Sequence, residues 1–451
     1  MESSISSTLP SGKMFLATSS QIHERYDPYY IFHKLNTSLE SKYRSERLSS
    51  LVNTFSGGTP SKSNPSYWDG DIPWISPKDF NGFNLFETED KITEEGVKNS
   101  STKVAPKNSI VIVVRSGVLA HTFPVCINRV PAAINQDLKV LTPTTEELLP
   151  EFLGYYFFTF GEKLLPLVTK HGTTVHSINT EQFERLQIPV PPIHIQEKVI
   201  SIYQEHFETK AQKEAKAEQL LKSIDEYLLN ELGITIPEED NSLTNRIFTT
   251  SFQNIAGSRF DPKFLHYDKI NVGNKFPVIN LKELVTINKG QSLTSKEVED
   301  GPYPVIAGGQ SSPYTHNEFT HSGNIITVSA SGAYAGYVWY HSSPIFATDC
   351  SVINSDNESR CLTEFIYWVL KSIQQELYKL QQGAAQPHVY PDDLKNIEIP
   401  LPELEKQEKI LAQVRMKKQA AEGLRKEAKQ SVEEARRQVE EMILEEDSVA
   451  V

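Results

Sequence analysis

Two long stretches of the chain carry apolar residues at helical spacing, with charged residues at most other positions. They cover residues 194–232 and 404–445. The apolar stripe positions are Ile195, Val199, Ile202, Ala217, Leu220, Ile224 and Leu228, then Ile410, Val414, Ala421, Leu424, Ala428, Ala435 and Met442. At 1.5 Å per residue each stretch predicts a helix of roughly 55–60 Å. Two striped helices of equal length should pair with each other. The alternative is separate packing on neighbouring domains.

The hydrophobic pattern before each long helix is of a different kind. Short apolar runs such as IVIVV in residues 108–117 predict a region rich in β-strands. Aromatic-rich helices are expected at about 149–168 and about 362–381. A loop with Gly172 or Gly383 follows, and then a proline-rich strand leads into the long helix. The pattern therefore predicts a mixed α/β (α+β) fold in each half.

The chain states this order of elements twice. Residues 188–200 read IPVPPIHIQEKVI, and residues 399–411 read IPLPELEKQEKIL, at a constant separation of 211. We call this repeated segment the proline phrase. Its prolines stand just before a helix, where proline costs least. The duplication predicts two equivalent domains in a pseudo-twofold arrangement.

Further markers place the two halves in one frame. Gly58 matches Gly290 at a separation of 232, and Asp137 matches Asp349 at 212. NSIVIVVRSG (108–117) matches GNIITVSASG (323–332) at 215, which sets Ala330 opposite Arg115. The falling separation means that the first half holds 17 more residues inside the shared frame. The additional material includes residues 58–80, so the two domains are expected to have different targets.

Composition indicates an ordinary globular protein. The 451 residues are 38% hydrophobic and 23% charged, which suits two or three domains. The richest apolar stretch (151–160) is half the ~20 residues needed to span a bilayer, and no signal peptide is evident. Cys126, Cys350 and Cys361 are odd in number and lack metal-like spacing, so a reducing cytoplasm is expected. The net charge of −13 argues against a protein that coats nucleic acid without help, although a local basic groove would fit it.

No catalytic motif emerges from the sequence. Asp27-Pro28-Tyr29-Tyr30 resembles the loop with which amino-methyltransferases hold a flipped base, but the second proline of that loop is missing. Asp-Pro more often starts a turn or a helix, which is the interpretation we favour. The chain has no glycine-rich cofactor loop and no histidine pair at metal-binding spacing. We therefore expect no catalytic residue and no metal site.

Residues 56–80, SGGTPSKSNPSYWDGDIPWISPKDF, resemble the start of a target recognition domain in the specificity subunit of type I restriction–modification systems. Residues 290–309, 323–336 and 382–410 resemble the other common sequence variant of that domain. The resemblance extends over roughly 45–232 and 278–445, in the same order twice. The leaders that contain Arg25-Tyr26-Asp27-Pro28 and Arg259-Phe260-Asp261-Pro262 are less diagnostic.

This resemblance implies a non-catalytic protein in which each recognition domain reads one half of a bipartite DNA site. Two long antiparallel coiled-coil helices would hold the domains apart. Two methyltransferase subunits would dock on the protein, use S-adenosylmethionine and methylate adenine, and motor-nuclease subunits could join. The expected divisions are a leader with the first recognition domain (1–193), the first spacer helix (194–233), a linker with the second leader (234–278), the second recognition domain (279–403), the second spacer helix (404–445) and a tail (446–451).

Base reading requires side chains that reach base edges and cations that hold the phosphates. The candidates are Lys62, Lys78, Arg115, Ser116 and His121 with Trp74 as a supporting aromatic in the first domain, and Lys289, Gln310, Ser331 and Tyr334 in the second. Arg115 is the strongest, because it follows the apolar strand IVIVV, precedes a turn at Ser116-Gly117 and could pair with both acceptors of guanine. The alternatives are a surface ion pair for Arg115, a core position for Trp74 and a solvated side chain for Lys62.

Two other functions compete with this interpretation. A stand-alone DNA-binding adaptor should show a clear basic excess, and this chain is acidic. A coiled-coil scaffold without restriction partners would leave two elaborate β-rich domains without a task. DNA binding measured with and without the methyltransferase separates the three.

Overall fold

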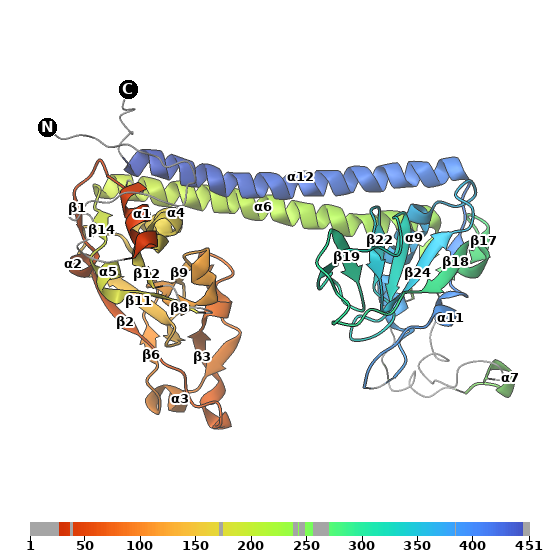
Figure 1. Ribbon diagram of the computed structural model, residues 1–451, viewed down its shortest axis with the longest axis horizontal. Helices are drawn as coiled ribbons and strands as arrows, with labels where there is room; N and C mark the ends of the chain where they lie inside the picture. Colours follow the sequence, from red (N-terminus) through yellow and green to blue (C-terminus); the bar gives the residue numbers. More distant parts are fainter. Residues whose placement is uncertain are drawn as a thin grey trace. The chain divides into compact units, whose positions relative to one another are not determined.

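The computed structural model describes residues 27–36, 39–170, 175–237, 242, 249–255, 270–383 and 385–444. Arg25, Tyr26, the second leader at 259–262 and Gly172 lie outside the described residues. The chain divides into two compact units (Figure 1). Unit 1 contains the residues up to 212 together with those from 427 onward, and unit 2 contains residues 213–426. Each long helix therefore contributes one half to each unit.

Unit 1 is built on a five-stranded sheet of order β2-β11-β7-β9-β4 and a four-stranded sheet of order β5-β3-β10-β6. The strands are β2 (Val52–Ser56), β3 (Trp68–Ile75), β4 (Asn84–Leu85), β5 (Asp90–Ile92), β6 (Lys103–Ala105), β7 (Ile110–Val113), β9 (Val125–Asn128), β10 (Ala132–Ile134) and β11 (Leu138–Pro143). All four side chains of β7 are buried. Because side chains alternate along a strand, Ile110 and Ile112 join the core under helix α4 (Pro150–Val168), whereas Val111 and Val113 join a second core.

Unit 2 repeats four of the five strands in the central sheet of unit 1, in the same order. Its four-stranded sheet has the order β18-β24-β21-β22, which corresponds to β2-β11-β7-β9. In both units a parallel strand pair accompanies this sheet, β3 with β10 in unit 1 and β19 with β23 in unit 2. The strands of unit 2 are β18 (Val285–Lys289), β19 (Tyr303–Ile306), β20 (Thr315–His316), β21 (Ile325–Ser329), β22 (Val338–His341), β23 (Phe346–Ala347) and β24 (Cys350–Ser355). The predicted duplication and the mixed α/β fold are confirmed.

Short elements complete each unit. They are α1 (Pro28–Asn36), β1 (Ser45–Arg47), α2 (Leu48–Leu51), α3 (Glu94–Lys98), β8 (Arg115–Ser116), β12 (Thr169–Lys170), β13 (His176–Ile178), α5 (Thr180–Glu184), β14 (Gln187–Pro189), β15 (Ile234–Thr235), α7 (Phe252–Ile255), β16 (Asn271–Val272), β17 (Val278–Asn280), α11 (Pro391–Leu394) and β25 (Glu398–Pro400). The Asp27 carboxylate accepts hydrogen bonds from the backbone N–H groups of Tyr29 and Tyr30, at 3.0 and 3.4 Å. Asp27-Pro28 thus starts a helix, as the sequence favoured.

The pairing of Gly58 with Gly290 is wrong by one residue. Gly57 follows β2 directly and Gly290 follows β18 directly. A Cβ atom on Gly57 would lie 1.9 Å from the Ile134 carbonyl oxygen, and one on Gly290 would lie 1.9 Å from that of Thr348. Both glycines therefore allow the same close crossing of two backbones. The sequence GlyGly at 57–58 offered two equal matches, and only the strand register separates them.

The expected aromatic helix at 149–168 is α4. Its counterpart, expected at about 362–381, is two helices, α9 (Thr363–Ser372) and α10 (Gln374–Tyr378). Ile373 between them leaves helical geometry, with φ −110° and ψ 25°. Gln374 then accepts a hydrogen bond from the Val338 N–H at 3.0 Å and donates to the Gly336 carbonyl at 2.8 Å. The break thus ties the helix to the turn before β22.

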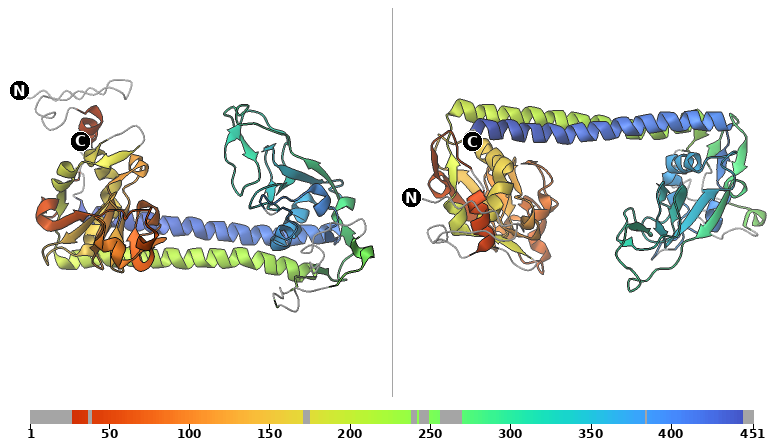
Figure 2. Two further views of the ribbon diagram at one scale, coloured as in Figure 1. Left: turned by 90° about the horizontal axis from the view of Figure 1, so that it is seen from below. Right: turned by 45° about the horizontal axis from the view of Figure 1, so that its top comes forward.

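The long helices are α6 (Ile193–Leu232) and α12 (Leu404–Ile443), and they lie side by side (Figures 1 and 2). Their contacts run antiparallel: within unit 1 His206 Nδ1 lies 2.9 Å from Ser431 Oγ, and within unit 2 Lys417 Nζ donates to Ser223 Oγ at 2.8 Å. The predicted pairing of the two helices is confirmed.

The ends of the two helices also belong to the domain cores. In unit 1, Val199, Tyr203 and Val439 join the core that contains α4. In unit 2, Ile224, Leu228, Ile410 and Val414 join the core that contains α9. Ala217, Ala421 and Ala428, nearer the helix middles, are buried but join neither core. The spacer is therefore continuous with the domains at its ends.

Candidate nucleic-acid interface

In unit 1 a surface turn after the buried strand β7 brings together three segments that are distant in sequence. Strand β8 continues from β7 and pairs with β13, with Arg115 opposite Ser177 and Ser116 opposite His176. The backbone N–H of Val114 donates to the Asp137 carbonyl at 2.8 Å. The loop that ends at Asp137 and the segment before α5 therefore hold the turn from two sides. We call residues 114–117 the first reading turn.

The corresponding turn of unit 2 aligns one residue further along than the sequence match implies. Leu138 pairs with Val113 in unit 1, and the equivalent Cys350 pairs with Ser329 in unit 2. This register sets Val114 opposite Ala330 and Arg115 opposite Ser331. Three backbone contacts of unit 2 agree with this register. The Ala330 N–H donates to the Asp349 carbonyl, the Val389 N–H donates to the Ala330 carbonyl, and Ser331 forms an isolated β-bridge with His388. The prediction that Ala330 matches Arg115 is therefore wrong.

In both reading turns a polar side chain contacts an aspartate, and the two aspartates occupy equivalent positions. In unit 1 the Nε of Arg115 lies 2.9 Å from Oδ1 of Asp137, with side-chain exposures of 62% and 21%. In unit 2 the hydroxyl of Ser331 donates to Oδ2 of Asp349. We call residues 330–333, the counterpart of 114–117, the second reading turn. The two turns share one construction and differ in the side chain that they present.

The other candidates of unit 1 occupy varied settings. Lys62 is exposed in a turn, and His121 is exposed at the end of the short helix after the first reading turn. The Ser116 hydroxyl caps that helix by accepting from the Val118 N–H at 3.4 Å. The Lys78 ammonium lies 3.0 Å from Asp90 and 3.1 Å from Glu89, and these carboxylates raise its pKa.

Trp74 is buried, and it contacts the loop that carries Lys62. Its side chain is only 3% exposed, and its indole N–H donates to the Gly58 carbonyl at 3.1 Å. Its ring meets that of Trp68 edge to face at 5.3 Å between centroids. Trp74 thus occupies a core position with Ile92 and Ala133, which is the alternative given for it, and from there it holds the loop that carries Lys62.

In unit 2 the candidates Lys289, Gln310 and Tyr334 are exposed. Sequence reasoning missed an aromatic pair beside the second reading turn: the rings of His388 and Tyr390 stack at 5.9 Å with 11° between their planes, and Tyr390 is 47% exposed. The motif QPHVYP at 386–391 was a signal for this pair, since unit 1 has Ser177 and Asn179 at the matching positions.

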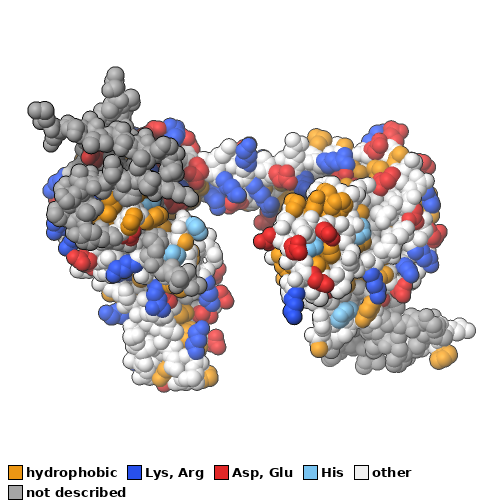
Figure 3. All heavy atoms as spheres, in the orientation of Figure 1, with side chains coloured by type: hydrophobic (Ala, Val, Ile, Leu, Met, Phe, Trp, Pro, Cys, Tyr) orange, Lys and Arg blue, Asp and Glu red, His pale blue; other side chains and the backbone are white. Residues whose placement is uncertain are grey.

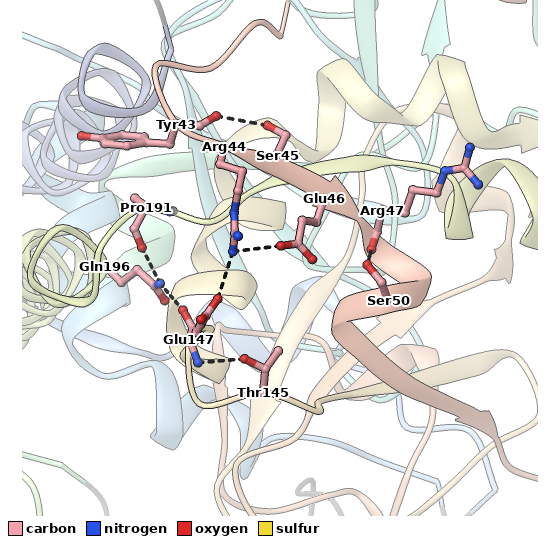
Figure 4. A network of polar contacts seen from close by, with 10 residues as sticks. All are labelled: Tyr43, Arg44, Ser45, Glu46, Arg47, Ser50, Thr145, Glu147, Pro191 and Gln196. Carbon is pink, nitrogen blue, oxygen red and sulfur yellow. Dashed lines mark hydrogen bonds and ion pairs between the residues drawn. The ribbon is translucent and has the colours of Figure 1, made fainter.

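The proline phrase contains a buried glutamine that fastens each domain to its long helix. In unit 1 the Gln196 amide donates to the carbonyls of Glu147 (2.6 Å) and Pro191 (2.8 Å) (Figure 4). Its oxygen accepts from the Leu149 N–H at 2.8 Å. Gln196 is fully buried. Because Leu149 immediately precedes α4, this glutamine joins the starts of α4 and α6.

Gln407 repeats the arrangement in unit 2. Its amide donates to the carbonyls of Arg360 (3.0 Å) and Pro402 (2.9 Å), and its oxygen accepts from the Leu362 N–H at 2.9 Å. Gln407 is also fully buried, and Leu362 precedes α9. We call Gln196 and Gln407 the glutamine clamps.

A pocket of about 420 Å³ lies beside the first clamp. It is lined by Lys42, Tyr43, Arg44, Glu147, Val190, Pro191, Pro192 and Ile193. Its charges are paired locally, since Arg44 bridges Glu46 and Glu147 at 2.9 Å each (Figure 4). The pocket thus marks the joint between the domain and α6.

Surface charge is mixed in both units. Figure 3 shows Lys and Arg side chains interspersed with Asp and Glu in the visible face of each unit. Within the described ranges no three His, Cys, Asp or Glu side chains cluster as a metal site. Of the helices that the structure describes, none combines the length and the apolar character needed to cross a membrane.

The structure thus defines a protein of two repeated α/β domains, each with a surface turn beside its central sheet and each fastened to a shared pair of long helices. Residues 40–222 and 274–425, well over half of the chain, match the type I restriction modification DNA specificity domain. The chain therefore belongs to this family, and the resemblance found in its sequence is confirmed.

Individual relatives agree with this assignment. Over 186 residues the chain is 37% identical to the EcoR124I/EcoR124II type I restriction enzyme specificity subunit of Escherichia coli, covering 41% of this chain and 46% of that one. It is 29% identical over 173 residues to the MjaIX specificity subunit of Methanocaldococcus jannaschii, covering 37% and 38%. The chain spans less than half the length of these relatives. A chain in a solved structure of the type I R-M system matches with a TM-score of 0.52 at 16% identity, over 89% of this chain and 96% of that one, which shows the fold alone.

Proposed function

We propose that this protein is the non-catalytic DNA specificity subunit of a type I restriction–modification complex, in which unit 1 reads one half of a bipartite site and unit 2 reads the other. One observation carries the proposal: the same reading turn occurs twice, once beside each of two equivalent sheets, with Arg115 in one copy and Ser331 in the other. A duplicated scaffold with a changed contact residue suits the recognition of two different short sequences.

We further propose that two methyltransferase subunits dock on the protein and bring the S-adenosylmethionine, and that motor-nuclease subunits can join the complex. The two copies of each domain and helix present two equivalent faces, as two identical partners require. The candidate DNA contacts remain Lys62, Lys78, Arg115, Ser116 and His121 over Trp74 in unit 1, and Lys289, Gln310, Ser331 and Tyr334 in unit 2. We place the complex in the cytoplasm, because Cys126, Cys350 and Cys361 are free and buried.

The mixed surface charge bears on how DNA is held. A chain with net charge −13 has few cations to spare for phosphates, so partners should supply most of the phosphate contacts. We expect the full chain alone to bind duplex DNA weakly, and its complex with the methyltransferase to bind tightly with a steep dependence on salt.

Two measurements test the proposal. Sequencing that detects methylated adenine, in cells with and without this chain beside its host's methyltransferase, should find a bipartite motif only when the chain is present. A gel shift on a duplex with that motif should require the methyltransferase. Tight specific binding by the chain alone would favour a stand-alone adaptor. No DNA binding in either form would favour a scaffold.

A further inference from the structure

We infer that Asp137 and Asp349 are equivalent positioning residues, each of which holds the side chain that reads a base in its domain: Arg115 as a donor to guanine, and Ser331 as an acceptor from an amino group of adenine or cytosine. This inference rests on the proposed function.

The aspartate of unit 1 is fixed before DNA arrives. Its backbone N–H donates to the Asn135 side chain at 2.6 Å, and its carbonyl accepts from the N–H groups of Val114 and Arg115. Asp137 is thus locked to the reading turn through its main chain, while its carboxylate engages side chains, with Oδ1 on Arg115 and Oδ2 accepting from the Gln136 amide at 3.3 Å. A substitution of this carboxylate leaves the main-chain bonds in place.

The ion pair orients the guanidinium of Arg115 and leaves its terminal nitrogens available as donors. Asp137 engages the Nε edge, and among the described residues no further partner of this guanidinium occurs. Its two terminal nitrogens therefore remain available as parallel donors. Guanine offers N7 and O6 side by side in the major groove, which is the acceptor pair that such a fork matches. A preoriented arginine also loses less side-chain entropy on binding.

The equivalent aspartate in unit 2, Asp349, makes Ser331 a hydrogen-bond acceptor, whereas Arg115 is a donor. A hydroxyl has one proton, and Ser331 donates that proton to Asp349. With its proton engaged, the hydroxyl oxygen can act toward a base only as an acceptor. In the major groove the exocyclic amino groups of adenine and cytosine are the base-edge donors. Ser331 should thus select against guanine and thymine at its position, where Arg115 selects for guanine.

The test is a double-mutant cycle read at single base pairs. The full chain, in complex with its host's methyltransferase, acts on a duplex library randomised in both half-sites, and adenine methylation is sequenced. We expect Arg115→Ala and Asp137→Asn each to lower guanine discrimination at one position of one half-site by about 10-fold. In the Arg115→Ala background, Asp137→Asn should change that discrimination no further. Asp349→Asn should affect only the other half-site.

Two controls keep a structural effect apart from positioning. Glu181→Gln removes a comparable exposed ion pair of unit 1, with Arg185 at 2.6 Å, and should leave both half-sites unchanged. Arg115→Lys keeps the charge at a 62% exposed position and should still lose guanine discrimination, because lysine lacks the fork.

Three results would overturn the inference. Asp137→Asn could match the wild type, it could act equally in the Arg115→Ala background, or it could alter both half-sites. Failure of the proposed function looks different, because the wild-type complex itself would then methylate no bipartite motif.

Discussion

The two units are alike at the glutamine clamps, where each domain meets its long helix, and differ at the reading turns. Gln196 and Gln407 make the same three hydrogen bonds to the same backbone positions, with donor–acceptor distances between 2.6 and 3.0 Å. At the reading turns the aspartate is shared, yet Arg115 faces it in one unit and Ser331 in the other. A buried hydrogen-bonded joint tolerates little change, whereas an exposed side chain can vary at small cost in stability. The comparison separates the residues that fasten each domain to its helix from the residues that we propose contact DNA.

The largest expected effect comes from lengthening the two long helices, α6 and α12, at once. Ser223 lies across from Lys417, so Gln219, about one turn earlier, lies across from the region of Ala421. Inserting seven residues beside each keeps the apolar stripe in register. The helices grow by roughly 10 Å, or roughly 3 base pairs, so the sequenced methylation motif should keep both half-sites with a longer gap.

The control for this experiment inserts the same seven residues into α6 alone. The stripes of α6 and α12 would then no longer match, and methylation should be lost. An active complex with the doubled insertion and an unchanged gap would show that the helices do not set the spacing.

The clamps provide the next largest effect and test the shared joint. Gln196→Leu and Gln407→Leu keep the side-chain volume but remove the partner of one buried carbonyl and of a partly buried carbonyl and N–H. Each should lower the free energy of unfolding by about 3 kcal/mol, and by similar amounts in the two units. Urea denaturation of the full chain measures the loss. Gln219→Leu, at an exposed position of α6, is the matched control; if it costs as much, the clamps contribute nothing special.

A buried histidine sharpens the contrast between the central sheets. His341 ends β22 and contacts Thr327 at 2.8 Å, and burial lowers its pKa to about 4. Its counterpart at the end of β9 is Asn128, which cannot titrate. In the unfolded chain His341 takes up a proton near pH 6.5, whereas in the folded chain it stays neutral until the pH approaches 4. The stability linked to His341 is therefore full above pH 6.5 and is lost as pH falls toward 4.

Between pH 7.5 and pH 5 this histidine should cost about 2 kcal/mol of stability. The variant His341→Asn copies unit 1 and should lose that much less than the wild type over the same interval. Urea midpoints at the two pH values give the difference. Equal losses in the two proteins would mean that His341 does not carry the acid sensitivity.

Much of the architecture follows from the chain alone. Apolar stripes at heptad spacing predict α6 and α12, because a helix must bury its apolar face, and two equal stripes bury each other. The duplication is visible in the proline phrase and in the matched aspartates Asp137 and Asp349. Local patterns of this kind survive in sequence because each is set by neighbours within one or two turns.

Tertiary structure decided what depends on distant partners. The glutamine of the proline phrase is visible in sequence, but its role requires backbone groups near residues 147 and 360, which only the fold brings within 3.0 Å. Strand pairing, not similarity between Arg-Ser-Gly and Ala-Ser-Gly, sets Arg115 opposite Ser331, since a one-residue difference in a turn leaves no periodic trace. The division of each long helix between two units likewise arises from packing, because its end turns complete cores built from residues far away in the chain.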